Sequence, residues 1–200
     1  TGSDVSSSKI IDRLISLGVK IHIGHNKNNI QNASIVVYSS AIKQNNPEII
    51  EAKNLFIPII HRSEMLSELM KLKKSIAIAG THGKTTTTSL ISKILDTNKM
   101  DPTIINGGII SSLASNAKLG QGQWMVVEAD ESDGSFSKLM PTVAVITNID
   151  LEHLDFHKNE KNLENAFINF ISSIPFYGFC SVCIDPVSYT HLRAHETVVH

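Results

Sequence analysis

Short apolar runs of the strand type alternate with helical stripes through roughly the first third of the chain. In the helical stripes, apolar side chains recur three or four residues apart, whereas the strand runs are short and rich in β-branched residues. The predicted elements are, in order, a helix over 10–17, strands over 19–23 and 34–38, a helix over 47–53, a strand over 55–57 and a helix that starts at Ser63. Strands that alternate with helices in this way predict α/β architecture with parallel strands.

A second region of the same kind begins after the basic segment 71–74. Its first strand, 75–79, leads directly into a glycine-containing turn and then into a helix whose apolar face includes Leu90 and Ile94. Further strands are predicted at 124–129, 143–149 and 179–184, with a helix around 163–171 before the last of them. The pattern predicts a parallel sheet over residues 75–186 with helices on both faces.

Composition narrows the class of protein. The chain has 200 residues, of which 42% are hydrophobic and 18% are charged, as expected for a folded soluble protein with one large or two small domains. The formal net charge is -1, and the Lys and Arg residues are scattered along the chain and form no basic stripe, so no nucleic-acid partner is expected. No apolar run approaches the roughly 20 residues of a membrane-spanning helix, and the first residues lack the features of a signal peptide. A cytoplasmic protein without a membrane partner is therefore expected. Cys180 and Cys183 lie within an apolar run and are interpreted as two buried thiols.

Residues 80–86 read Gly-Thr-His-Gly-Lys-Thr-Thr and lie between a predicted strand and a predicted helix. This arrangement binds nucleotide phosphates, because glycine lets backbone N–H groups turn toward an anion and the helix N-terminus adds positive potential. Lys84 can neutralise the outer phosphates, and the Thr85 hydroxyl can bind Mg²⁺. The spacing is shorter than in the common G-x-x-x-x-G-K-[ST] pattern, because Ile78 stands where that pattern has glycine. On the pattern alone, a coincidental glycine-rich turn is the alternative.

Polar residues follow two further predicted strands. Glu128 opens the acidic run 128–133 at the end of the strand 124–129, and His153 follows the next strand. Mg²⁺ prefers hard oxygen ligands, and the carboxyl ends of parallel strands form the ligand-binding edge of such a sheet. Glu128 is therefore a candidate metal ligand, and His153 a candidate metal or phosphate contact. The alternatives are a solvated acidic loop and an ordinary surface or core histidine.

Taken together, three motifs resemble the Mur ligase family in order and spacing. They are the phosphate loop 80–86, the run Glu-Ala-Asp-Glu-Ser-Asp at 128–133, and Thr-Asn-Ile-Asp at 147–150 followed by Glu152 and His153. The short phosphate loop is the form typical of that family. The similarity extends over residues 1–186 and includes the segments 2–4, 23–25, 40–43, 46–48 and 175–178.

The resemblance implies an ATP-dependent amide ligase of peptidoglycan precursor synthesis, with ATP and Mg²⁺ as cofactors. By analogy with the family, Lys84 would bind the outer phosphates and Thr85 would hold Mg²⁺. Glu128 would face the metals, and His153 would bind a second metal. Lys84, Glu128 and His153 are thus the candidate catalytic residues. The N-terminal part of the family binds UDP, so Asp4 and His25 are candidate substrate contacts. The ATP-binding residues implied are Gly80, Thr81, His82, Gly83, Lys84, Thr85 and Thr86.

Within the family, the chain is most similar to members that join L-alanine to the lactyl carboxylate of UDP-N-acetylmuramate through an acyl phosphate. Ser132 stands where the related tripeptide-recycling ligases typically carry tyrosine, which favours L-alanine as the amine. The expected partners are UDP-N-acetylmuramate, L-alanine and ATP. The alternatives are the recycling ligase and a phosphate-loop nucleotide-binding fragment without ligase activity.

The expected architecture is α/β, with a partial Rossmann-like N-terminal domain over 1–73 and a truncated phosphate-loop Mur ligase central domain over 74–186 that contains a parallel sheet. Residues 187–200 follow neither a helix, a strand nor the family pattern, and they are interpreted as a disordered or non-native tail. The chain resembles an incomplete copy of a family member, and by itself it is expected to lack ligase activity.

Overall fold

The structure is a computed structural model that describes residues 1–110, 115–130, 135–150 and 159–183. The chain divides into two compact units, residues 1–65 and residues 66–200, called here the first and the second unit. The expected domain boundary at residue 73 stays a prediction. Ser132, His153 and the segment 187–200 lie outside the described residues.

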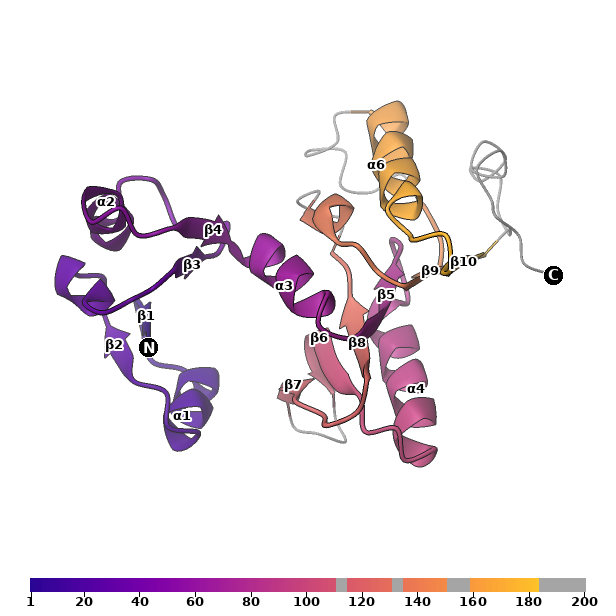
Figure 1. Cartoon of the computed structure of the whole chain (residues 1–200), viewed down its shortest axis with the longest axis horizontal. Coiled ribbons are helices and arrows are strands. Elements are labelled where there is room, and N and C mark those ends of the chain that lie inside the picture. Colours follow the sequence, from indigo (N-terminus) through magenta and orange to yellow (C-terminus); the bar gives the residue numbers. More distant parts are fainter. Residues whose placement is uncertain (111–114, 131–134, 151–158, 184–200) are drawn as a thin grey trace. The chain divides into compact units, whose positions relative to one another are not determined.

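The first unit contains two pairs of parallel strands with short helices between them (Figure 1). Strand β1 (Gly2–Asp4) pairs with β2 (Ile21–Ile23), and β3 (Val36–Tyr38) pairs with β4 (Ile59–His61). The helices are α1 (Lys9–Ser16), the 3-10 helix η1 (Lys27–Ile30) and α2 (Pro47–Asn54), and α3 (Arg62–Met70) begins in this unit. The alternation of strands and helices confirms the α/β class expected from the sequence.

Local sequence signals explain where the helices of this unit begin. The Ser8 hydroxyl accepts a hydrogen bond from the backbone N–H of Ile11, and the Asn46 side chain accepts one from the N–H of Glu48. Both residues therefore satisfy N–H groups that the first turn of a helix leaves without partners. Pro47 follows Asn46 at the first helical position, where its missing N–H has no consequence.

The strand predicted at 55–57 is wrong, since the strand of this region is β4. Helix α2 continues to Asn54, with Leu55 as its C-cap. Phe56 has a φ of 55°, which lies in the left-handed region and outside the range of a strand. The apolar residues after α2 therefore form a turn, and the strand starts only after Pro58. Strand β1 was not predicted.

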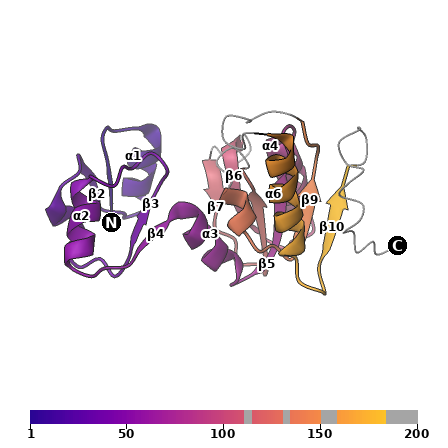
Figure 2. The ribbon, with the colours of Figure 1, turned by 90° about the horizontal axis from the view of Figure 1, so that it is seen from above.

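The second unit is built on a six-stranded sheet with the order β10-β9-β5-β8-β6-β7 (Figure 2). Neighbouring strands are parallel except for β6 and β7, which are antiparallel. The strands are β5 (Lys74–Ala79), β6 (Thr103–Ile110), β7 (Ser115–Lys118), β8 (Trp124–Glu128), β9 (Val143–Ile146) and β10 (Phe179–Val182). The expected parallel sheet is confirmed, but β6 and β7 were missed and β7 makes the sheet mixed.

Helices cover both faces of this sheet. Helix α4 (Lys84–Thr97) and helix α6 (Glu160–Ser172) lie on opposite sides of β5 (Figure 1). One face of the sheet packs against α6 and the 3-10 helix η2 (Ser135–Lys138), where Phe136, Phe167 and Phe170 are fully buried. Ile78 and Val126 are buried as well and alternate with residues of that face, so they point toward α4. The central strands β5 and β8 are therefore apolar on both sides and reach the sheet edge at fixed positions.

The two cysteines are less buried than expected. Cys180 is half-buried and Cys183 is exposed, so the interpretation as two buried thiols is wrong. Among the described residues, strand β10 lies at the edge of the sheet and pairs only with β9. No helix within the described part of the chain is long and apolar enough to cross a membrane.

Candidate functional site

The loop between β5 and α4 is shaped by two glycines with positive φ. Gly80 has a φ of 128° and Gly83, the N-cap of α4, has a φ of 78°. A Cβ atom on Gly80 would lie 2.7 Å from the carbonyl oxygen of Asn148, closer than such atoms approach. Both positions therefore require glycine, and the chain turns tightly from the end of β5 into the first turn of α4.

The predicted phosphate-binding residues surround this turn. The ammonium group of Lys84 donates hydrogen bonds to the carbonyl oxygens of Gly80 (2.6 Å) and Thr81 (3.2 Å), which hold it over the loop. Thr85 and Thr86 lie exposed in the first turn of α4, where backbone N–H groups have no helical partners. A cationic side chain and the positive end of a helix thus act on the same small volume, which suits an anion.

Glu128 reaches the loop from the neighbouring strand β8. Its carboxylate oxygens accept hydrogen bonds from the Thr85 hydroxyl at 3.0 and 3.2 Å, although the two residues are far apart in sequence. The backbone N–H of Gly107, in β6, donates to the same carboxylate at 3.0 Å. A Cβ atom on Gly107 would lie 2.9 Å from Glu128 Oε1, so a larger residue there would force the Glu128 carboxylate to shift. The structure therefore brings Thr85 and Glu128 together and adds Gly107, which sequence reasoning missed along with β6.

The geometry of this pair suits a magnesium ion. Adjacent ligands of an octahedral Mg²⁺ with Mg–O distances of about 2.1 Å lie about 3.0 Å apart. The Thr85 hydroxyl and Glu128 Oε2 are separated by 3.0 Å, so one ion could bind both after little movement. Both are hard oxygen donors. Within the described segments no group of three or more His, Cys, Asp and Glu side chains is gathered around a metal position.

The segment 147–150, which directly follows β9, holds the phosphate loop from the other side. The Asn148 side chain accepts a hydrogen bond from the backbone N–H of His82 (2.7 Å) and donates one to the carbonyl of His82 (3.2 Å). The Thr147 hydroxyl also donates to the carbonyl of His82, at 2.6 Å. The Thr81 hydroxyl accepts a hydrogen bond from the N–H of Asp150, at 2.9 Å. Sequence reasoning used these strand-end residues only as the approach to His153, but they fix the loop itself.

The His82 side chain also lies close to a carboxylate in this region. Its Nε2 lies 3.6 Å from a carboxylate oxygen of Asp150, and both side chains are about half exposed. An exposed pair of this kind contributes little to stability. The His82 side chain is therefore largely exposed, while its backbone is held by the residues that follow β9.

The candidate substrate residues line a pocket of the first unit. The pocket is open, has a volume of about 760 Å³ and is lined by both Asp4 and His25. The Asp4 side chain accepts a hydrogen bond from the N–H of Ser6. His25 follows Gly24, which has a φ of 89° and donates its N–H to the carbonyl of Asp4. The turn after β2 therefore places His25 beside the end of β1.

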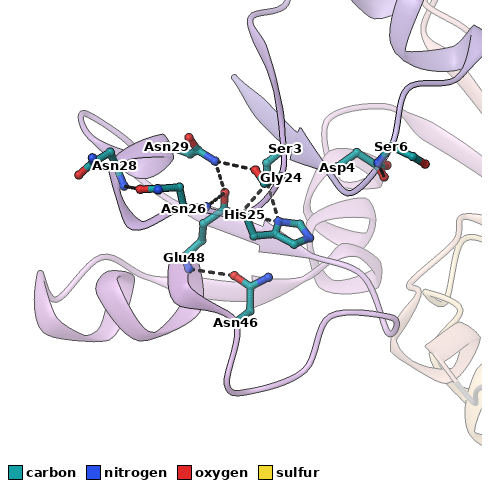
Figure 3. A network of polar contacts seen from close by, with 10 residues as sticks. All are labelled: Ser3, Asp4, Ser6, Gly24, His25, Asn26, Asn28, Asn29, Asn46 and Glu48. Atoms are coloured by element: carbon teal, nitrogen blue, oxygen red, sulfur yellow. Dashed lines mark hydrogen bonds and ion pairs between the residues drawn. The ribbon is translucent and has the colours of Figure 1, made fainter.

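Glu48 is the centre of a polar network in this pocket that sequence reasoning missed (Figure 3). Its carboxylate accepts hydrogen bonds from the Ser3 hydroxyl (2.6 Å), the Asn29 side chain (2.6 Å) and the backbone N–H of Asn26 (3.4 Å), and it lies 3.3 Å from Nδ1 of His25. Burial raises the pKa of the Glu48 carboxyl, but the hydrogen bonds and the nearby His25 outweigh this and leave the pKa below its ordinary value. Glu48 is therefore an ionised, nearly buried carboxylate.

Comparisons with protein families match almost the whole chain. The model described as Mur ligase family, catalytic domain, matches residues 1–74, and the model of the Mur ligase middle domain matches residues 78–199. The first of these regions contains the pocket with His25 and Glu48. The second contains the phosphate loop and Glu128.

Individual proteins give the same result. The chain is 55% identical over 185 residues to a UDP-N-acetylmuramate--L-alanine ligase of Geotalea daltonii, and the match covers 92% of this chain and 40% of the relative. A ligase of the same name from Rhodopseudomonas palustris is 54% identical, and that match covers 94% of this chain and 41% of the relative. The chain thus spans about 40% of the length of the curated relatives it matches.

Solved structures share the fold. The UDP-N-acetylmuramate-alanine ligase of Thermotoga maritima has a TM-score of 0.84 and 29% identity, covering 96% of this chain and 44% of that one. The murein peptide ligase of Psychrobacter arcticus has a TM-score of 0.83 and 25% identity, with 98% of this chain and 46% of that one covered. The match to the family models over most of the chain shows that this protein belongs to the Mur ligase family.

Proposed function

We propose that this chain is the nucleotide-sugar-binding and ATP-binding part of an ATP-dependent ligase that joins L-alanine to the lactyl carboxylate of UDP-N-acetylmuramate. Relatives that bear the name UDP-N-acetylmuramate--L-alanine ligase are 54–55% identical to it. Because ATP and nucleotide sugars are cytoplasmic metabolites, the proposed reaction belongs to the cytoplasm.

The observation that carries the ATP-dependent part is the meeting of Lys84, Thr85 and Glu128 at one sheet edge. On ATP binding, Lys84 would exchange the two loop carbonyls for outer phosphate oxygens. Thr85 and Glu128 would hold Mg²⁺, which offsets the negative charge of the phosphates. His153, outside the described residues, is proposed as the ligand of a second metal. These groups supply positioning and charge neutralisation, which dominate phosphoryl transfer.

The proposed chemistry needs no strong base in its first step. The lactyl carboxylate is already an anion, so it can attack the γ-phosphorus of ATP and form an acyl phosphate with release of ADP. The uncharged amine of L-alanine then attacks the acyl carbon and displaces phosphate, and the amide forms with loss of a proton from nitrogen. In this scheme the first unit binds the UDP part of the sugar through the pocket that Asp4 and His25 line.

Nucleotide binding is tested with the 200-residue chain itself. Titration with ATP in the presence of Mg²⁺ should give saturable binding that Lys84→Ala weakens at least about tenfold, because the phosphates lose a fixed cation. Lys93→Ala is the matched control, since Lys93 is an exposed lysine further along α4. Equal loss of binding in the two variants would contradict a specific role for Lys84.

The ligase reaction is tested with a chimera in which residues 1–183 replace the matching part of the Geotalea daltonii relative. Phosphate release should then depend on ATP, Mg²⁺, UDP-N-acetylmuramate and L-alanine together, and Lys84→Ala should abolish it. The 200-residue chain measured alongside should bind ATP without L-alanine-dependent release. Release driven by a tripeptide in place of L-alanine would favour the recycling ligase. ATP binding without release under either condition would favour a nucleotide-binding protein of another function.

A further inference from the structure

The network around Glu48 determines which ring nitrogen of His25 carries a proton. Nδ1 of His25 lies 3.1 Å from the Ser3 hydroxyl oxygen and 3.3 Å from Glu48 Oε2 (Figure 3). The Ser3 hydroxyl is 2.6 Å from the same Oε2, and its single proton is used in that shorter hydrogen bond. Nδ1 therefore faces two oxygen atoms that can only accept from it, so Nδ1 must be the donor.

The other ring nitrogen is left for the pocket. His25 is one of the residues that line the pocket, and 17% of its side chain is exposed. Figure 3 shows the second ring nitrogen on the side of the ring away from Glu48. With the proton on Nδ1, a neutral His25 has its lone pair on Nε2, where it can accept a hydrogen bond.

We infer that Glu48 is a positioning residue: it fixes the proton of His25 on Nδ1 and thereby presents the Nε2 lone pair to a hydroxyl or N–H group of the bound nucleotide. The nature of the ligand rests on the proposed function, whereas the position of the proton does not. Glu48 can perform this task because it is itself held in place. Its second oxygen, Oε1, accepts hydrogen bonds from the N–H of Asn26 and from the Asn29 side chain.

Glu48→Gln should move the ring proton of His25 from Nδ1 to Nε2. An amide has one oxygen and one NH₂ group, so it cannot accept from all the donors around Glu48. The Asn26 donor is backbone, and the Asn29 amide also donates to the carbonyl of Gly24 at 3.1 Å, which fixes its orientation. The oxygen of the glutamine therefore takes the Oε1 position. Its NH₂ group then faces Nδ1 of His25, which must become an acceptor, and the ring proton moves to Nε2.

The test is a long-range ¹H–¹⁵N correlation spectrum of the ligand-free, ¹⁵N-labelled chain at a pH where the ring is neutral. The protein contains nine histidines, and a His25→Gln variant identifies the signals of His25. Wild-type protein should show the proton on Nδ1, Glu48→Gln should show it on Nε2, and Ser3→Ala should keep it on Nδ1. Glu51→Gln is the matched control, because Glu51 lies one turn on in α2 and does not line the pocket.

Titration with UDP gives the second readout. Glu48→Gln should bind UDP about tenfold more weakly than wild type, because the ring then presents a proton instead of a lone pair, and Glu51→Gln should bind as wild type does. A wild-type proton on Nε2, an unchanged tautomer in Glu48→Gln, or an inverted tautomer with unchanged UDP affinity would each overturn the inference. The wild-type spectrum decides even if Glu48→Gln does not fold. Wild-type protein with the proton on Nδ1 but without UDP binding would contradict the proposed function of the first unit and leave the role of Glu48 in fixing the proton supported.

Discussion

Removing the Asn148 side chain should loosen the phosphate loop without disrupting the sheet beneath it. In Asn148→Ala the backbone N–H and carbonyl of His82 lose their hydrogen bonds of 2.7 and 3.2 Å to the Asn148 side chain, while the carbonyl keeps the hydrogen bond of 2.6 Å from the Thr147 hydroxyl. Each such bond contributes about 0.5–1.5 kcal/mol net. His82 is exposed, so water can replace part of this, and a combined loss of about 1–2 kcal/mol is expected.

The loss should appear in nucleotide affinity, because the loop must be ordered again when the phosphates bind. A penalty of about 1–2 kcal/mol corresponds to roughly 5- to 30-fold weaker binding. The assay is calorimetric titration of the chain with ATP and Mg²⁺, accompanied by chemical denaturation to measure the free energy of unfolding. Asn148→Asp should be at least as weak as Asn148→Ala, because its second oxygen would face the carbonyl of His82 and its charge would oppose the phosphates.

Asn98→Ala is the matched control for this substitution. Asn98 is the C-cap of α4 and donates one hydrogen bond of 2.8 Å to the carbonyl of Ile94, at the end of the helix away from the loop. It should lower stability slightly and leave ATP affinity unchanged. If Asn148→Ala bound ATP as tightly as Asn98→Ala does, the hydrogen bonds from the Asn148 side chain would not prepare the loop, and the reasoning would be refuted.

Other substitutions test the glycine turn, the metal ligand and the buried carboxylate. Gly80→Ala should lower the free energy of unfolding by about 3 kcal/mol or more, because it combines a φ of 128° with a clash against Asn148. Gly18→Ala is the control and should lower it by only about 1–2 kcal/mol, because Gly18 has a φ of 87° and open space around it. Equal losses in denaturant melts would contradict this prediction. Glu128→Gln should raise the Mg²⁺ concentration needed for half-maximal ATP binding by about tenfold or more, and an unchanged requirement in the same titration would show that the carboxylate holds no metal. The lowered pKa of Glu48 means that its contribution to stability is complete above the ordinary value of 4.5 and is lost as the pH falls through the folded-state pKa. Denaturant melts between about pH 3 and pH 7 should therefore show that the free energy of unfolding falls more steeply with acid in wild type than in Glu48→Gln. Parallel curves would contradict this contribution of Glu48.

The sequence by itself determined the features that depend on neighbours along the chain. Helices α1, α2, α4 and α6 follow from the spacing of apolar residues and from capping side chains such as Ser8 and Asn46. The phosphate loop is one continuous strand–turn–helix segment, so its glycines and Lys84 can be recognised without knowledge of the rest of the fold. Glu128 could be assigned to the ligand edge because a residue that directly follows a buried strand emerges at a fixed point.

Tertiary structure decided everything that depends on which strands become neighbours. Strand β6 escaped prediction because Asn106, Gly107 and Gly108 interrupt its apolar pattern, yet Gly107 supports Glu128 from that strand. Asn148 meets His82 only because β9 pairs with β5, and the Glu48 carboxylate meets Ser3 and His25 only because α2 folds back toward β1 and β2. The backbone hydrogen bonds that pair strands are the same for every residue type, so side-chain identity along one segment does not specify its neighbour. Contacts between distant segments are selected by the packing of the whole core, and the residues that hold the loop and orient His25 are therefore visible only in the folded molecule.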